Sequence, residues 1–171
     1  SFISGYTVKQ VSVEPPMFVD VVNVTSAADM ADVVKSKAAE QDIIIMTAAV
    51  ADFCPSHPAD EKIKKNDSSY ESVIELERTE DILSYLGAHK AKGQLICGFS
   101  METQNMLENS KAKLAKKNAD MIVANNLKVA GAGFGTDTNV VTLITADDCT
   151  ELEIMDKSCV AARIMDRLLK M

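Results

Sequence analysis

An aspartate and a group of lysines, close together in the sequence, offer the clearest chemistry in this chain. Asp52 comes a few residues after the apolar run 43–46, and Lys62, Lys64 and Lys65 follow it. A carboxylate beyond a buried strand can bind Mg²⁺ or a ribose hydroxyl, and clustered lysines can neutralise the charge of a reacting phosphate. Both features also have simpler interpretations, because aspartate often caps turns and runs of charge are usually solvated. The loop that carries both is where we expect the chemistry.

A second pair of cations, Lys113 and Lys117, lies four residues apart. On a helix this spacing places both lysines on one face, where they could bind the same anion. Lysines in a last helical turn also complement the helix dipole without any ligand. The glycines within residues 130–136 precede a predicted hairpin rather than a helix, so we interpret them as a turn and not as a phosphate-binding loop.

Hydrophobic periodicity predicts alternating strands and helices around these residues. The expected strands are residues 19–24, 42–46 (a central strand), 72–76, 94–99 and 121–124. The expected helices are residues 26–39 with Ser26 as N-cap, 81–89 and 103–117. Residues 53–55 and the polar stretch after them are expected to be loop.

The last part of the chain is expected to form a hairpin and a helix. The hairpin strands are 140–145 and 151–155, joined through Asp147 and Asp148. The closing helix places one apolar set on a single face: Ala161, Ile164, Met165 and Leu168.

Strands alternating with helices predict an α/β fold, a three-layer Rossmann-like doubly wound sheet with a C-terminal β hairpin. We expect a single domain over residues 1–171. In such sheets ligands bind beyond the carboxyl ends of the strands. Three of these ends stand out, at residues 47–52, 98–103 and 125–136.

The composition limits the possible partners and locations. The net charge of −7 and the pI near 4.8 argue against binding to a nucleic acid backbone, which requires a basic face. The sequence has neither an apolar run long enough to span a bilayer nor a signal-peptide pattern, so we expect a cytoplasmic protein. The four cysteines lack zinc-site spacing and are interpreted as free thiols.

Taken together, several motifs resemble the phosphopantothenate-cysteine ligase family, the synthetase domain of coenzyme A biosynthesis. They occur in order between residues 47 and 139: Thr47-Ala-Ala-Val-Ala-Asp52, Glu61-Lys-Ile-Lys-Lys65, Asp81-Ile-Leu83, Gly98-Phe99 with Glu102-Thr103, Lys113 to Lys117, Ile122-Val-Ala-Asn125, and Gly133-Phe-Gly135 with Asn139.

The resemblance implies a reaction and a set of site residues. In this family a nucleotide, CTP in bacterial enzymes, activates 4'-phosphopantothenate as an acyl-cytidylate with release of pyrophosphate, and L-cysteine then displaces CMP. Mg²⁺, a homodimer and a fused or associated flavin-dependent decarboxylase are implied as well. Lys62 would reach the reacting phosphate and carboxylate, and Asp52 is a candidate Mg²⁺ ligand. The residues expected around the nucleotide are Met46, Thr47, Ala48, Asp52, Lys62, Thr79, Glu80, Asp81, Ile82, Phe99, Lys113 and Lys117.

The sequence also departs from the family pattern. Ser100 and Met101 stand where small alanines are frequent, and Thr79-Glu80 stands where Asn-Pro is frequent. Residues 1–5 resemble the second strand of the family, so the first βα unit, with its glycine-rich turn, is expected to be missing.

Two alternatives remain open from the sequence. An NAD(P)-dependent oxidoreductase would share the fold class, but its G-x-G-x-x-G turn is not present in the sequence. A dimerisation fragment without catalytic competence is the other alternative.

Overall fold

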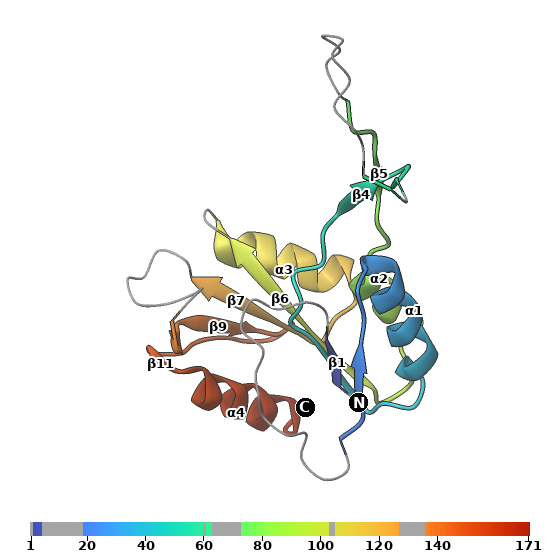
Figure 1. Ribbon diagram of the computed structural model, residues 1–171. Coiled ribbons are helices and arrows are strands. Elements are labelled where there is room, and N and C mark those ends of the chain that lie inside the picture. The colour runs from blue at the N-terminus through green and yellow to red at the C-terminus, as the bar shows by residue number, and fades with distance from the viewer. Residues whose placement is uncertain (1, 5–18, 60, 63–72, 103–104, 127–135) are drawn as a thin grey trace. The chain divides into compact units, whose positions relative to one another are not determined.

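The computed structural model describes residues 2–4, 19–59, 61–62, 73–102, 105–126 and 136–171. The chain forms two compact units, one of residues 1–32 and 49–81 and the other of residues 33–48 and 82–171. Figure 1 labels the helices and strands of both. Helix α1 (Ala27–Ala38) begins in the first unit and ends in the second. Among the described residues, no helix has both the length and the apolar character that a membrane crossing requires.

The larger unit is built on a five-stranded mixed sheet. Its strands lie in the order β10 (Cys149–Glu151), β9 (Val141–Ile144), β7 (Met121–Asn126), β6 (Leu95–Glu102) and β3 (Ile43–Met46). Strands β3, β6 and β7 are parallel, and β9 and β10 continue the sheet as an antiparallel hairpin.

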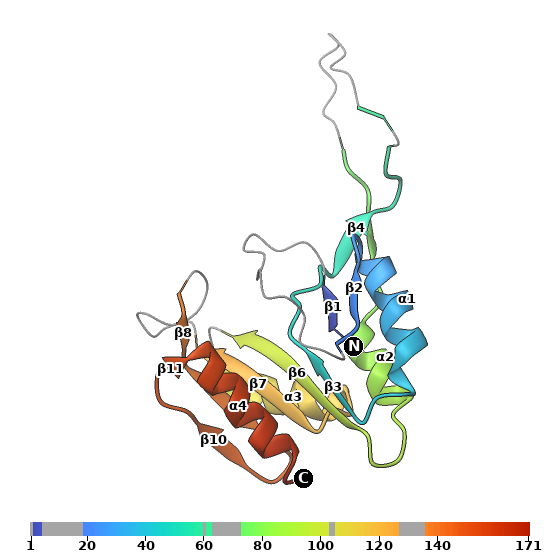
Figure 2. The same ribbon diagram turned by 60° about the horizontal axis from the view of Figure 1, so that its bottom comes forward.

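Helices cover both faces of this sheet. Helix α3 (Met106–Lys116) lies on one face and α4 (Lys157–Leu168) on the other, as Figures 1 and 2 show from two directions. Helix α2 (Ile82–Ala88) packs against β6. The predicted three-layer α/β fold with a C-terminal hairpin is thereby confirmed.

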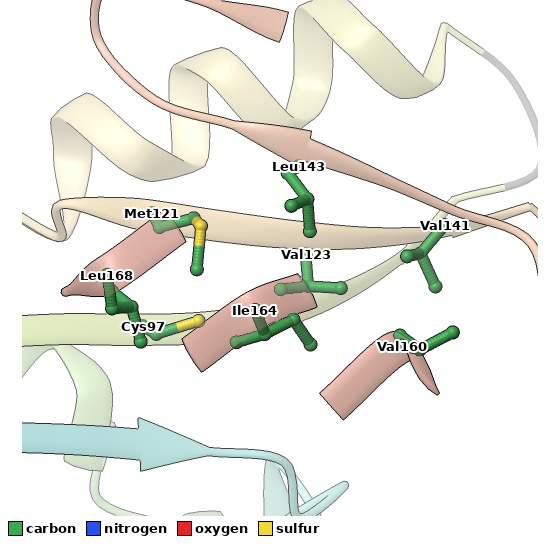
Figure 3. Packing of buried hydrophobic residues seen from close by; sticks show 8 residues of the cluster. All are labelled: Cys97, Met121, Val123, Val141, Leu143, Val160, Ile164 and Leu168. Carbon is green, nitrogen blue, oxygen red and sulfur yellow. The ribbon is translucent and has the colours of Figure 1, made fainter. Parts of the chain in front are cut away.

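The main hydrophobic core lies between the sheet and α4. Cys97, Met121, Val123, Val141 and Leu143 of the sheet meet three α4 residues spaced four apart, Val160, Ile164 and Leu168 (Figure 3). The predicted apolar face of this helix was half wrong, because Ala161 and Met165 are exposed. Two neighbouring stripes of α4 are apolar, and periodicity alone could not tell which one faces the sheet.

Close backbone contacts join α2 to its neighbours. A Cβ atom at Gly98 would lie 2.6 Å from Leu83 Cδ2, and a Cβ atom at Gly87 would lie 1.8 Å from the Lys117 carbonyl oxygen. Asn118 Nδ2 donates a hydrogen bond to the Gly87 carbonyl at 2.7 Å. Gly87 therefore allows a backbone approach that any side chain would prevent, whereas at Gly98 the contacting atom is the end of the flexible Leu83 side chain.

The smaller unit contains two short strand pairs and a capped helix start. Strand β1 (Phe2–Ser4) runs parallel to β2 (Val21–Asn23), and β4 (Phe53–Pro55) runs antiparallel to β5 (Leu76–Arg78). Ser26 Oγ accepts a hydrogen bond from the Asp29 N–H, and Asp29 Oδ2 accepts one from the Ser26 N–H. This reciprocal capping confirms Ser26 as the N-cap of α1.

Several predicted elements are corrected by the structure. Strand β3 is at an edge of the five-stranded sheet and only half-buried, whereas β6 and β7 are central. An apolar run indicates covered faces but not the number of neighbouring strands. Residues 53–55, expected to be loop, form β4, because their backbone groups pair with those of β5.

Two strand positions also differ from the prediction. The strand expected at 72–76 begins only at Leu76, and the second hairpin strand begins at Cys149 rather than Glu151. Met155–Asp156 forms a separate strand, β11, which pairs with β8 (Thr138–Asn139). The predictions for Lys64, Lys65 and the glycines of 131–135 lie outside the described residues.

Candidate functional site

The carboxyl ends of the three parallel strands share one edge of the larger unit. Met46, the last residue of β3, pairs with Gly98 of β6, and Gly98 pairs with Ile122 of β7. Thr47 and Ala48 follow directly and are exposed. Met46 is thus opposite the residue that precedes Phe99 in β6, and Thr47 and Ala48 follow the end of β3. Strand β6 continues to Glu102, so residues expected to form a loop after it belong to the strand itself.

Lys113 and Lys117 are held by neighbouring elements through hydrogen bonds. Lys113 Nζ donates to the carbonyl oxygen of Phe99 at 2.8 Å, and Lys117 Nζ donates to Ser84 Oγ at 2.9 Å. Both side chains are half-buried. The structure thus brings Lys113 to β6 and Lys117 to α2, instead of leaving two cations whose only role is to complement the helix dipole.

Two of the apolar site candidates of this unit, Ile82 and Phe99, are used in packing. Ile82, at the start of α2, is 3% exposed, and Phe99 packs against the core cluster below α4. The side chains of Ile82 and Phe99 therefore contribute to packing.

The smaller unit holds the remaining candidates. Thr79 donates hydrogen bonds to two carbonyl oxygens, from its backbone N–H to Asp52 at 3.0 Å and from its hydroxyl to Ala51. Asp52 and Thr79 are therefore brought together at one end of the β4–β5 ribbon. The side chains of Asp52, Lys62, Glu80 and Asp81 are exposed.

The described residues offer few ligands for a metal ion. Among them, no three His, Cys, Asp or Glu side chains gather as a metal-binding group. Magnesium, however, often takes only one or two protein carboxylates and fills the remaining positions with water and substrate phosphates. The exposed carboxylate of Asp52 fits that partial role.

The buried thiol of Cys97 is not a nucleophile. Burial raises the pKa of Cys97 to about 12, and the nearby Asp120 carboxylate adds to the shift. A thiol with this pKa stays protonated at neutral pH, and the thiolate is the reactive form. Cys97 is therefore a core residue, as its place in the α4 cluster indicates.

One pair at this edge was not assigned a role from the sequence. Asn139 Nδ2 donates to Asn125 Oδ1 at 2.7 Å, and Asn139 Oδ1 accepts from the Val140 N–H at 2.9 Å. The signal available in the sequence was two asparagines in separate family motifs. Their contact depends on the pairing of β7 with β9, which the sequence does not specify.

Comparison with known protein families identifies the chain. The model of the family described as DNA/pantothenate metabolism flavoprotein C-terminal domain matches residues 3–171. The chain belongs to this family. Because the match covers nearly the whole sequence, it includes both compact units and all the candidate site residues.

Relatives within this family agree with the motifs. The chain is 46% identical over 91% of its length to the coenzyme A biosynthesis bifunctional protein CoaBC of Bacillus subtilis, of which it covers 38%. It is 45% identical over 88% of its length to a cysteine/cysteine sulfinic acid decarboxylase of an unknown prokaryotic organism, of which it covers 42%. The chain thus spans about two fifths of the length of these relatives.

A solved structure shows the same fold. The crystal structure of the C-terminal domain of a CoaBC protein superposes with a TM-score of 0.76 at 40% identity, covering 99% of this chain and 74% of that chain. The resemblance to the synthetase domain of the bifunctional coenzyme A biosynthesis protein, predicted from the motifs, is confirmed.

Proposed function

We propose that this protein joins 4'-phosphopantothenate to L-cysteine in coenzyme A biosynthesis and uses CTP to activate the acid. The observation that carries the proposal is the match to the C-terminal, pantothenate-metabolism family over residues 3–171, together with 46% identity to a bifunctional coenzyme A biosynthesis protein. Lys113, bonded to β6, and Lys117, bonded to α2, supply suitable chemistry for an anionic nucleotide, as do the exposed Asp52 and Lys62.

The first step forms a mixed anhydride. An oxygen of the phosphopantothenate carboxylate attacks the α-phosphorus of CTP, a P–O bond forms, and the bond to pyrophosphate breaks. This brings two anions together, so cationic groups aimed at the developing charge lower the barrier. Lys62, which is exposed and follows β4 in the chain, is assigned to the reacting phosphate and carboxylate.

The second step forms the amide. The cysteine amine attacks the acyl carbon, CMP leaves with the electron pair of the anhydride bond, and the amine loses its proton. Holding both reactants in line can supply roughly 7–11 kcal/mol of the barrier reduction. We assign binding of the nucleotide to Lys113, Lys117 and the backbone of Phe99, and to the other residues that the family resemblance implies.

The preorganised lysines support this assignment. Lys113 and Lys117 are fixed by the Phe99 carbonyl and the Ser84 hydroxyl, so less side-chain entropy is lost when an anion binds. When bound, Mg²⁺ would supply charge neutralisation to the phosphates. Asp52 is the residue we assign to hold it.

We further propose a cytoplasmic homodimer that acts with a flavin-dependent decarboxylase. Exposed apolar side chains in and before β5 support self-association, with Val73, Ile74 and Leu76 at 81%, 72% and 59% exposure. The bifunctional description of one relative and the decarboxylase name of another support a second activity in the full-length protein.

The two alternatives considered from the sequence, an oxidoreductase and a dimerisation fragment, are not supported by the family match. The family match favours a role in pantothenate metabolism over an NAD(P)-dependent oxidoreductase. A dimerisation fragment without catalysis would bind neither nucleotide nor acid productively. The experiment that follows separates it from the ligase.

Pyrophosphate release tests the proposal. The natural full-length protein is incubated with Mg²⁺, 4'-phosphopantothenate, cysteine and either CTP or ATP, and each component is omitted in turn. We expect release that requires phosphopantothenate and is faster with CTP. Absence of release with either nucleotide would reject the ligase.

A further inference from the structure

The hydrogen bonds around Asn125 and Asn139 fix which atoms these side chains present. The Val140 backbone N–H can only donate, so the atom 2.9 Å from it must be the Asn139 oxygen. The Asn139 NH₂ then donates to Asn125 at 2.7 Å, which identifies the contacting Asn125 atom as its oxygen. The NH₂ group of Asn125 is therefore directed away from the pair.

The NH₂ group of Asn125 can donate a hydrogen bond that the described residues do not accept. Asn125 and Asn139 are both half-buried. Within the described part of the chain, no hydrogen bond to Asn125 Nδ2 is present. Polar groups in partly buried positions are normally paired, and an unpaired one costs free energy. The arrangement thus favours an acceptor that arrives with a ligand or with water.

The pair lies at the edge of the sheet where the candidate site is located. Asn125 is next to last in β7 and is opposite Met101 of β6. Side chains alternate along a strand, so Asn125 shares the face of Met121 and Val123, which pack on α4. Lys113 lies in α3 and Lys117 is the C-cap of this helix, which covers the other face (Figure 2). Asn125 is therefore placed to contact a different reactant from the one that the lysines bind.

We propose that Asn125 donates a hydrogen bond to an acceptor oxygen of the acid substrate, and that Asn139 is the positioning residue that aims it. This role rests on the proposed function. The acid carries carboxylate, amide and phosphate oxygens, all of which accept hydrogen bonds, and its negative charge strengthens a bond to a correctly oriented NH₂.

Two isosteric substitutions test the orientation. Asn125→Asp still accepts from the Asn139 NH₂, but it replaces the outward donor with an anionic oxygen. Asn139→Asp still accepts from Val140 but offers Asn125 no donor, so the Asn125 amide turns over and presents its own oxygen to the ligand. If the two asparagines had only a structural role, Asn139→Asp would not be expected to impair binding of the acid.

Steady-state kinetics of the full-length protein give the readout. We expect kcat/KM for the acid to fall about 10- to 100-fold in both variants, corresponding to loss of a hydrogen bond to a charged group, while KM for the nucleotide stays constant. Asn109→Asp is the matched control, because it makes the same charge change at an exposed position of α3. It should leave both constants unchanged.

The outcomes separate this role from the proposed function. A wild-type protein that ligates, together with variants that bind the acid normally, would overturn the role of Asn125 alone. Equal losses for acid and nucleotide, accompanied by a lower melting temperature, would also overturn it. An inactive wild-type protein would reject the ligase, and the role of Asn125 with it. If an aspartate variant fails to fold, Asn125→Ser, which keeps an acceptor for Asn139, provides the same comparison.

Discussion

The three lysines assigned to the candidate site differ in how the protein holds them. Lys113 and Lys117 are half-buried and bonded to Phe99 and Ser84, whereas Lys62 is exposed. Removing a bonded lysine should therefore disturb packing as well as binding. Removing Lys62 should affect the reaction alone, which makes it the sharper test of catalysis.

We predict that Lys62→Ala abolishes ligation, with a loss of at least about 100-fold in kcat, because a donor aimed at developing charge is removed. Stability should not change, since an exposed side chain contributes little to it. Pyrophosphate release and thermal melting measure the two effects. Lys92→Ala, a change at another exposed lysine, is the control. Normal turnover in the Lys62 variant would remove this residue from the mechanism.

At the residue scale, the sequence identified the charged candidate residues but not the residues to which they are hydrogen-bonded. Spacing placed Lys113 and Lys117 on one helix face, yet their partners Phe99 and Ser84 come from elements far along the chain. The Asn125–Asn139 bond was not predictable for the same reason. Long-range side-chain contacts depend on which strands pair, and local patterns do not encode that.

At the element scale, the contact between α2 and α3 connects packing to the site. Gly87 allows α2 to approach the Lys117 backbone, and Lys117 Nζ binds Ser84 of the same helix. Any side chain at position 87 must push the two helices apart. The position of Lys117 would change with them.

We predict that Gly87→Ala destabilises the protein by about 1–3 kcal/mol through overpacking and also raises KM for the nucleotide. The matched control is Gly93→Ala. Gly93 has φ of +84° and nothing within 4 Å, so its substitution strains only the local backbone. Denaturant unfolding and KM are compared for both variants. A Gly93 variant that weakens nucleotide binding as much as the Gly87 variant would contradict the proposed link.

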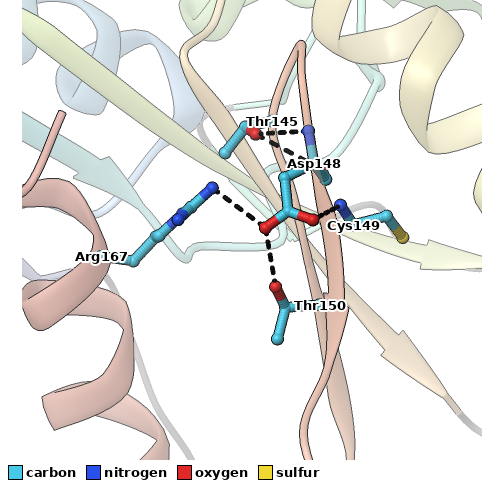
Figure 4. Close-up of polar contacts among 5 residues, drawn as sticks. All are labelled: Thr145, Asp148, Cys149, Thr150 and Arg167. Atoms are coloured by element: carbon cyan, nitrogen blue, oxygen red, sulfur yellow. Dashed lines mark hydrogen bonds and ion pairs between the residues drawn. The ribbon is translucent and has the colours of Figure 1, made fainter.

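The β9–β10 hairpin is tied to α4 through Asp148. Its carboxylate accepts hydrogen bonds from Thr150 Oγ1 at 3.0 Å and the Cys149 N–H at 2.7 Å, and it pairs with Arg167 at 3.1 Å (Figure 4). The Thr150 hydroxyl first, then the Cys149 N–H and the Arg167 charge, lower the pKa of Asp148.

A lowered pKa in the folded state gives a defined pH dependence. The contribution of Asp148 to stability is present above its unfolded pKa and is lost as pH falls through the folded value. We predict that Asp148→Asn lowers the melting temperature at neutral pH and that the difference from wild type shrinks below about pH 4. Asp166→Asn, at an exposed position of α4, serves as control. A difference that stays constant down to low pH would show that the charge of Asp148 is not responsible.

Element types were predictable where periodicity was strong. Strands β6 and β7 and helices α2 and α3 were all expected, with shifted ends. The corrections concern β3, which is an edge strand, and β4, whose strand state comes from pairing with β5. Both depend on neighbours in the sheet rather than on local sequence. The N-cap of α1 was predictable because capping is a local interaction.

At the scale of the whole molecule, the candidate residues are divided between the two compact units. Asp52, Lys62, Thr79, Glu80 and Asp81 belong to the smaller unit, and the other nucleotide-binding candidates belong to the larger one. Ordered motifs along the chain predicted the family without any knowledge of this division. The family match confirms that prediction, because it spans residues 3–171 and so includes both sets of candidates.

Isotope transfer from the acid to the nucleotide tests the central claim most directly. The full-length protein is given CTP, cysteine and 4'-phosphopantothenate labelled with ¹⁸O in its carboxylate, and the products are analysed by mass spectrometry. The proposed acyl-cytidylate predicts that one carboxylate oxygen appears in CMP and that pyrophosphate remains unlabelled. Formation of the amide with unlabelled CMP, or with label in inorganic phosphate, would contradict this account.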